Sequence, residues 1–160
     1  MAWRLSTGLR NALLGLASGD GSLKTILANG QIRIFTGTQP ASADDAETGA
    51  LLCTITLASG AMESGVATNG INLGVAVAGV IGKAAGEVWS GVNNASGTAG
   101  WFRYYPNAFD NHKGAASGGN KIRLDGRVAT SGAEMTLTST ALIVDVTSTA
   151  TTVELTLPAS

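Results

Sequence analysis

The chain has 160 residues, of which 44% are hydrophobic and 13% are charged, and its formal net charge is −1. Soluble domains carry about 25% charged residues, so this composition indicates a largely uncharged surface of the kind that neighbouring subunits cover. The near-zero net charge excludes a generic binder of polyanions, and we expect no nucleic-acid partner.

The counts of reactive residues exclude further classes of protein. The single cysteine, Cys53, rules out an intrachain disulfide and a cysteine zinc site, and the single histidine, His112, rules out a multi-histidine metal site. No apolar run reaches the length of about 18 residues that a transmembrane helix needs, so no membrane partner is expected. Residues 1–19 lack the unbroken apolar core of a signal peptide, so we expect this segment to be retained and the chain not to be exported by the general secretory route.

The first thirty residues are predicted to be helical. Four leucines recur at spacings of four, four and three, which places them on one helical face: Leu5, Leu9, Leu13 and Leu16. Ser6 or Thr7 can cap this helix, and a second short helix is predicted for residues 22–28 with Ser22 as its cap. Residues 19–21 resemble a flexible joint, so we expect residues 1–30 to form a helical arm whose leucines contact either the chain's own sheet or a neighbouring subunit.

The remainder of the chain, residues 31–160, shows the two-residue alternation of strands. Strands are predicted at 32–36, 51–57, 69–82, 87–92, 100–105, 121–129, 133–139, 141–146 and 151–157. Short strands at regular spacing are typical of a sandwich or barrel. The prediction is therefore a mainly β protein, with a β-sandwich or barrel-like domain of about eight strands. Residues 37–49 are predicted to form a loop with one helical turn at Ser42, and residues 106–120 an exposed excursion.

Four features could carry chemistry, and each has a simpler interpretation. Asp44, Asp45 and Glu47 could act as acid and base or bind calcium, or could form a solvated loop. His112 could belong to a catalytic triad but has no accompanying nucleophile elbow, so a surface-loop histidine is the simpler interpretation. Cys53 alternates with apolar neighbours as a buried thiol does. The glycines at 79 and 82 precede a lysine but lack the rest of a phosphate-binding loop, and bulges or close contacts in a sheet are the simpler reason for them. We predict no enzymatic activity, no cofactor and no metal site.

The aromatic residues cluster near two strands. Trp89 and Trp101 could stack sugars or single-stranded bases, or could serve the core and a contact between subunits. We predict both as interface residues. Arg103 lies in a predicted strand, where an unpaired buried charge would be very costly. Asp125, in a later strand, is its candidate partner in a bidentate ion pair, and two separate solvent-facing charges are the alternative.

Four segments together are similar to a known family. These segments are Ile32–Cys53, Gly100–Arg103, Leu124–Gly126 and Ser131–Met135. They resemble a family of small structural proteins encoded by tailed bacteriophages and prophages, over about residues 20–157. The resemblance implies a particle component without catalytic residues, assembled in the bacterial host cytoplasm and located in the virion.

The composition and the resemblance lead to one expected function with two alternatives. We expect a virion structural protein, most specifically a capsid decoration or cement protein, whose partners are copies of itself and other virion proteins such as the major capsid protein. A tail or head–tail connector component is the alternative within the virion. A carbohydrate-binding adhesin domain that uses Trp89 or Trp101 is the alternative outside this class.

Overall fold

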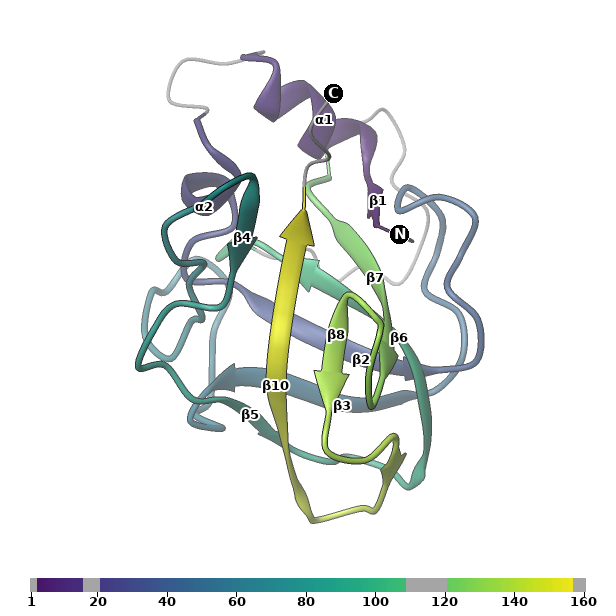
Figure 1. Cartoon of the computed structure of the whole chain (residues 1–160). Helices are drawn as coiled ribbons and strands as arrows, with labels where there is room; N and C mark the ends of the chain where they lie inside the picture. The colour runs from purple at the N-terminus through teal and green to yellow at the C-terminus, as the bar shows by residue number, and fades with distance from the viewer. Residues whose placement is uncertain (1–2, 16–20, 109–120, 157–160) are drawn as a thin grey trace.

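The computed structural model describes residues 3–15, 21–108 and 121–156, which form a mainly β fold with two short helices (Figure 1). The helices are α1 (Thr7–Leu13) and α2 (Leu23–Ile26). The ten strands are β1 (Arg4–Leu5), β2 (Gln31–Thr36), β3 (Leu51–Leu57), β4 (Val80–Gly82), β5 (Trp89–Val92), β6 (Gly97–Tyr105), β7 (Leu124–Ala129), β8 (Met135–Leu137), β9 (Ala141–Leu142) and β10 (Thr147–Thr156).

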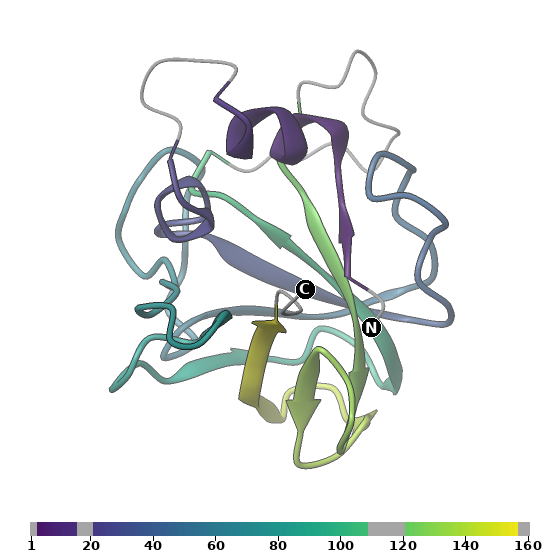
Figure 2. The same cartoon turned by 45° about the horizontal axis from the view of Figure 1, so that its top comes forward.

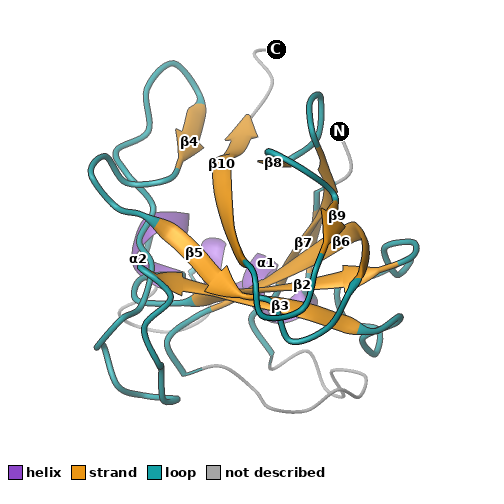
Figure 3. Cartoon of the chain, turned by 90° about the horizontal axis from the view of Figure 1, so that it is seen from below, coloured by secondary structure: helices purple, strands orange, loops and turns teal. Residues whose placement is uncertain are grey.

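Seven of the strands close into a barrel. The order around it is β7-β8-β10-β5-β3-β2-β6, and β6 pairs with β7 again to complete the ring. Figure 3, viewed from below, shows these strands arranged in a ring. β1 extends the sheet from β7, β4 pairs with β10, and β9 pairs with β6. The predicted β-rich class is confirmed, and of the two predicted architectures the protein has the barrel.

One pairing in the barrel is parallel. Val128 of β7 lies opposite Met135 of β8, although only a short loop separates the two strands. Parallel neighbours usually need a crossover of a dozen residues or more. Here the Glu134 carboxylate holds the loop, because it accepts hydrogen bonds from the backbone N–H of Arg127 at 3.0 Å and from the Arg127 Nε at 3.2 Å. These two hydrogen bonds join the start and the end of the loop, so that β8 lies beside β7.

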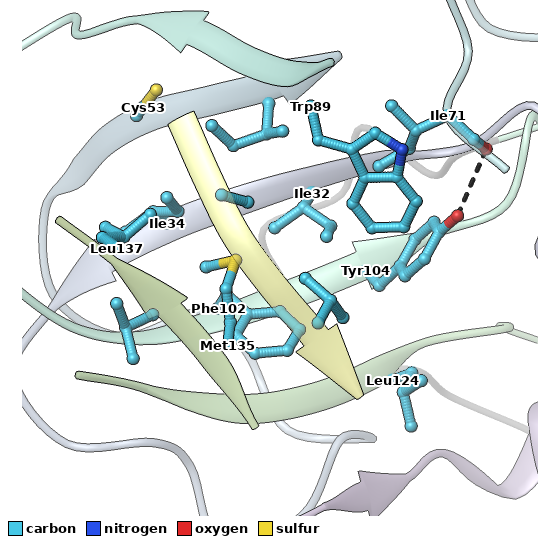
Figure 4. Close-up of a cluster of buried hydrophobic side chains, with 14 of the residues drawn as sticks. Ile32, Ile34, Cys53, Ile71, Trp89, Phe102, Tyr104, Leu124, Met135 and Leu137 are labelled. Carbon is cyan, nitrogen blue, oxygen red and sulfur yellow. Dashed lines mark hydrogen bonds between the residues drawn. The ribbon is translucent and has the colours of Figure 1, made fainter. Parts of the chain in front are cut away.

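The inside of the barrel is the hydrophobic core (Figure 4). Alternate residues of β2 and β6 point into it, namely Ile32 and Ile34 of β2 and Phe102 and Tyr104 of β6, all fully buried. The only polar atom of the Tyr104 side chain, its hydroxyl, donates to the Ile71 carbonyl at 3.2 Å. Burying a side chain of this size stabilises the fold by about 1.5–3 kcal/mol, so the core is the main source of stability.

The N-terminal residues belong to this same fold, contrary to the prediction of a separate arm. Leu5 lies in β1 and pairs with Leu124, so it is not part of the helix. Leu9 of α1 is fully buried in the common core. Figure 2 shows β1 beside β7 and α1 across one end of the barrel. Leu13 is 38% exposed, and Leu16 lies outside the described residues.

Ser6 explains how this segment is attached. It caps α1 as predicted, because its Oγ accepts a hydrogen bond from the Leu9 N–H. The same hydroxyl donates to the Lys121 carbonyl at 2.6 Å and accepts from the Arg123 N–H at 3.0 Å. One fully buried side chain therefore joins the helix to the segment that leads into β7.

Two predicted strands are much shorter than their apolar sequences suggest. In the range 69–82, only Val80–Gly82 is a strand, and the rest makes isolated bridges at Ile71, Leu73 and Val77. The chain turns sharply at both ends of this range, because Asn69, Ala78 and Gly79 all have positive φ. In the range 141–146, a turn follows β9 after two residues, and the next strand begins at Thr147.

Candidate functional site

The two tryptophans predicted at an interface are fully buried within the chain, so that prediction is wrong for both. Trp89 packs edge-on to Tyr104 in the core, and its Nε1 donates to the Glu87 carboxylate at 2.6 Å. Trp101 stacks on Phe35, with ring centroids 4.5 Å apart, and its Nε1 donates to a loop carbonyl at 3.3 Å. Neither ring offers a free face to a sugar.

Trp101 is buried because the barrel wall is covered on its outside as well. Phe102 and Tyr104 point inward, so Trp101, Arg103 and Tyr105 point outward. A strand residue that faces outward is normally exposed, yet these three are fully buried. The loop of residues 37–50 lies over them. We call this outer set of side chains and the loop above it the arginine layer.

Arg103 and Asp125 form the ion pair that the sequence suggested. Their residues lie opposite each other on β6 and β7. The Arg103 Nε donates to Asp125 Oδ1 at 2.7 Å and its Nη2 donates to Oδ2 at 2.8 Å, with both side chains fully buried. Burial by itself would lower the pKa of Arg103, but its hydrogen bonds to Asp125 and the charge of that carboxylate outweigh it and raise that pKa. The guanidinium also lies over the Trp101 ring, 5.4 Å from its centroid.

The loop is held by Arg33 of β2, Arg103 of β6 and Arg123, which directly precedes β7. Arg103 and Arg123 each donate to the carbonyl oxygen of Asp45, at 3.0 and 3.3 Å. Glu47 accepts a hydrogen bond from the Tyr105 hydroxyl and forms an ion pair of 3.4 Å with Arg33. Burial and the hydrogen bond to Glu47 raise the pKa of Tyr105 above its ordinary value. These contacts attach the loop to the wall at two positions.

The acidic cluster is dispersed among these structural contacts. Asp44 accepts hydrogen bonds from the N–H and the hydroxyl of Thr7, the latter at 2.6 Å. The Asp45 carboxylate accepts from the Ser42 N–H at 2.8 Å, within the turn that was predicted to begin at Ser42. Asp44, Asp45 and Glu47 therefore stabilise the loop and do not converge on one point. Among the described residues, no three His, Cys, Asp or Glu side chains come together as metal ligands.

The other two candidate residues do not add chemistry to this region. Cys53 is buried between the strands of the barrel, and burial raises the pKa of its thiol to about 12. A thiol with this pKa is almost entirely protonated near neutral pH and is a poor nucleophile. His112 lies outside the described residues.

Exposed apolar side chains gather on two surfaces that the sequence analysis did not identify. The first, which we call the barrel-end patch, consists of Val92, Ile143, Val144 and Val146, which are 43–61% exposed. The turn after β9 and the end of β5 form it, at the lower end of Figure 1. Asn93 holds the two segments together, since its N–H donates to Val146 and its Nδ2 donates to Ile143. A cavity of about 130 Å³ lies beside the patch.

The second surface, which we call the edge hairpin, is residues 73–82. Val75 and Val77 are 77% and 71% exposed there, and no charged residue occurs between Glu63 and Lys83. Figures 1 and 3 show β4 and the connection that precedes it standing to one side of the barrel. Exposed apolar patches on a soluble protein commonly mark contacts with partners. These two surfaces are therefore candidate contact sites, whereas Leu9 and the two tryptophans are buried and are not; Leu13, which is exposed, stays a candidate as predicted.

No helix among the described residues is both long and apolar enough to cross a membrane. No protein-family model, no curated protein and no solved structure matches this chain.

Proposed function

We propose that this chain is a structural component of a tailed-phage virion, and specifically a capsid decoration or cement protein. The observation that carries the proposal is the pair of separate exposed apolar surfaces on a barrel whose inner core and arginine layer are both closed. A protein with two such surfaces can contact a copy of itself through one and the coat protein through the other. The resemblance in sequence to phage structural proteins supports the same function.

The barrel-end patch is the surface that fits a contact with the coat. Its four apolar residues lie on short segments tied together by the backbone and side chain of Asn93. A contact surface that is already ordered loses little conformational entropy on binding. Such a surface suits a cement protein, which adds to a shell that has already formed.

The alternatives make different predictions. A tail or head–tail connector component would carry the same apolar surfaces but would be found in a different part of the particle. The adhesin alternative loses support, because Trp89 and Trp101 are both fully buried. Under this proposal the virion component has no enzymatic activity, and the residues of the arginine layer have a structural role only.

The experiment is to purify particles of the phage or prophage that encodes the chain and to locate the protein in heads or in detached tails by mass spectrometry. We expect it in heads, and we expect the purified protein to bind capsids that lack it and to raise their melting temperature. Ile143→Lys should abolish this binding, whereas Val66→Lys, at a separate exposed valine, should not. Copurification with tails, or absence from particles, would contradict the proposal.

A further inference from the structure

We propose that the edge hairpin joins two copies of this chain by antiparallel pairing of residues 74–78 with the same residues of a second copy. The inference deepens the proposed function and rests on it only for its biological role, because the pairing itself can be measured on the isolated protein. It assigns the contact between copies to one edge of the sheet.

The edge hairpin ends in a tight turn that leaves its outer strand unpaired. Val77 and Val80 exchange two backbone hydrogen bonds of 2.9 Å, and the two residues between them, Ala78 and Gly79, have φ of 50° and 78°. Positive φ at both central positions is the signature of the two-residue hairpin turn that matches strand twist. β4 continues the sheet by pairing with β10, so residues 74–78 form the outermost edge.

The outer edge has backbone groups available for a further strand. Gly74 donates its N–H inward to the Gly82 carbonyl at 2.8 Å, and Val77 donates inward to Val80. Among the described residues, the N–H groups of Val75 and Ala76 have no hydrogen-bond partner. Proteins usually protect such edges with charges, prolines or bulges. This edge has no charge and no proline, and its four residues 75–78 are all exposed. Its one irregularity is a bulge, because Gly74 bonds to Gly82 and Val77 to Val80, so residues 75 and 76 together stand opposite Ile81.

The sequence of this edge is complementary to itself. In a two-fold antiparallel pair centred on Ala76, each Val75 lies opposite the Val77 of the other copy, and the two Ala76 residues face each other. A two-fold contact always pairs residue i with j and j with i. The arrangement therefore creates two Val–Val cross-strand pairs, and all four valines share one face of the new sheet. β-branched pairs of this kind are favourable in sheets.

Charge selects a second copy rather than a different partner. A symmetric contact brings like charges near each other, so it favours an uncharged segment, and the chain has no charge from residue 64 to residue 82. The edge offers no charged group by which it could select an oppositely charged partner. A short strand pair is a weak contact in isolation, but copies held close together on a particle would gain from effective concentration.

The test uses the full chain in solution, without particles. Sedimentation over a concentration series should show a monomer–dimer equilibrium, and Val77→Lys should weaken the dimer at least about tenfold, since each interface receives the substitution twice. Ile143→Lys, on the barrel-end patch, should leave the dimer unchanged. A wild-type chain that stays monomeric, or a dimer insensitive to Val77→Lys, would overturn the inference.

A cross-linking experiment tests the register. Ala76→Cys places two thiols at directly opposed positions, where Cα atoms about 4.5–5.5 Å apart fall within the range of a disulfide. Mild oxidation should therefore link Ala76→Cys chains into covalent dimers. Val75→Cys is the matched control, because its two thiols would be diagonal neighbours about 7–8 Å apart and should link poorly. The native Cys53 is buried and does not interfere. Equal linking of both variants would overturn the proposed register.

The outcomes separate this inference from the proposed function. A chain that is incorporated into virions but forms neither the dimer nor the cross-link of the Ala76→Cys variant would leave the virion function standing and overturn the pairing. A chain that dimerises through the edge hairpin but is absent from particles would do the reverse.

Discussion

The buried pair of Arg103 and Asp125 allows a quantitative prediction. Replacing Arg103 with Ala leaves a carboxylate that is fully buried, and breaking a buried pair by removing one partner costs about 3–5 kcal/mol. The substitution also removes the hydrogen bond to the Asp45 carbonyl and the contact with the Trp101 ring. We therefore expect the free energy of unfolding to fall by about 3–5 kcal/mol.

The assay is urea unfolding followed by tryptophan fluorescence, applied to a double-mutant cycle. Each single variant, Arg103→Ala and Asp125→Ala, leaves one charge buried without its bidentate partner, whereas the double variant removes both. We expect the double variant to lose less than the sum of the single losses, by about 1.5–3 kcal/mol. Arg127→Ala is the matched control, because the Arg127 side chain is 50% exposed in its pair with Glu134 and should cost at most about 1 kcal/mol.

Two results would refute the reasoning. If the two single losses added to within about 0.5 kcal/mol, the residues would not be coupled. If Arg103→Ala cost no more than Arg127→Ala, the arginine layer would contribute no more than an exposed ion pair does. In the second case the loop of residues 37–50 would have to be held mainly by its other contacts.

Three further predictions concern stability. Leu9→Ala should cost about 2–5 kcal/mol, whereas Leu13→Ala, at a partly exposed position, should cost much less; equal losses in urea unfolding would contradict the packing of α1. The free energy of unfolding should fall as pH rises from 9 towards 12, and Cys53 should contribute up to about 1.4 kcal/mol per pH unit to this fall. The reason is that the thiol has its ordinary pKa of 9.0 in the unfolded chain, whereas burial raises that pKa to about 12 in the folded chain. Cys53→Ala should make the decline shallower, and an unchanged slope would refute this prediction. Gly100→Ala should lower the melting temperature strongly because its Cβ would lie 1.9 Å from the Gly37 carbonyl oxygen, whereas Gly74→Ala, with no atom closer than 3.5 Å, should change it little.

The sequence is informative where local chemistry decides the structure. Ser6 and Ser22 are both recognisable as helix caps because their hydroxyls can accept hydrogen bonds from the first turn, and both do so. The alternation of β6 places Arg103 on the face opposite Phe102, and the cost of burying a charge then requires a partner for it. Both arguments use only neighbours in sequence and the free energy of desolvation.

The sequence is misleading where a distant segment decides the structure. Nothing near Trp101 shows that the loop of residues 37–50 covers the outside of the wall, because that loop is polar and resembles a solvated connection. The loop is held through backbone carbonyl oxygens, such as that of Asp45. Because every residue has a carbonyl oxygen, the sequence does not show which ones accept hydrogen bonds. The apolar run at 69–82 predicts one long strand, and only the positive φ values at Ala78 and Gly79 reveal a projecting hairpin.

The three successive partners of β10 have a consequence for how the protein folds. The strand pairs with β5 over its first residues, with β8 in the middle and with β4 at its end. Every one of these contacts spans a long or moderate stretch of chain, and barrels dominated by such non-local pairs fold slowly, in about milliseconds to seconds. Until β10 docks, three strands expose open edges at once, and the apolar edge hairpin is among them. Partly folded chains are therefore most prone to aggregate before the barrel closes. The rate at which β10 docks determines how long this period lasts.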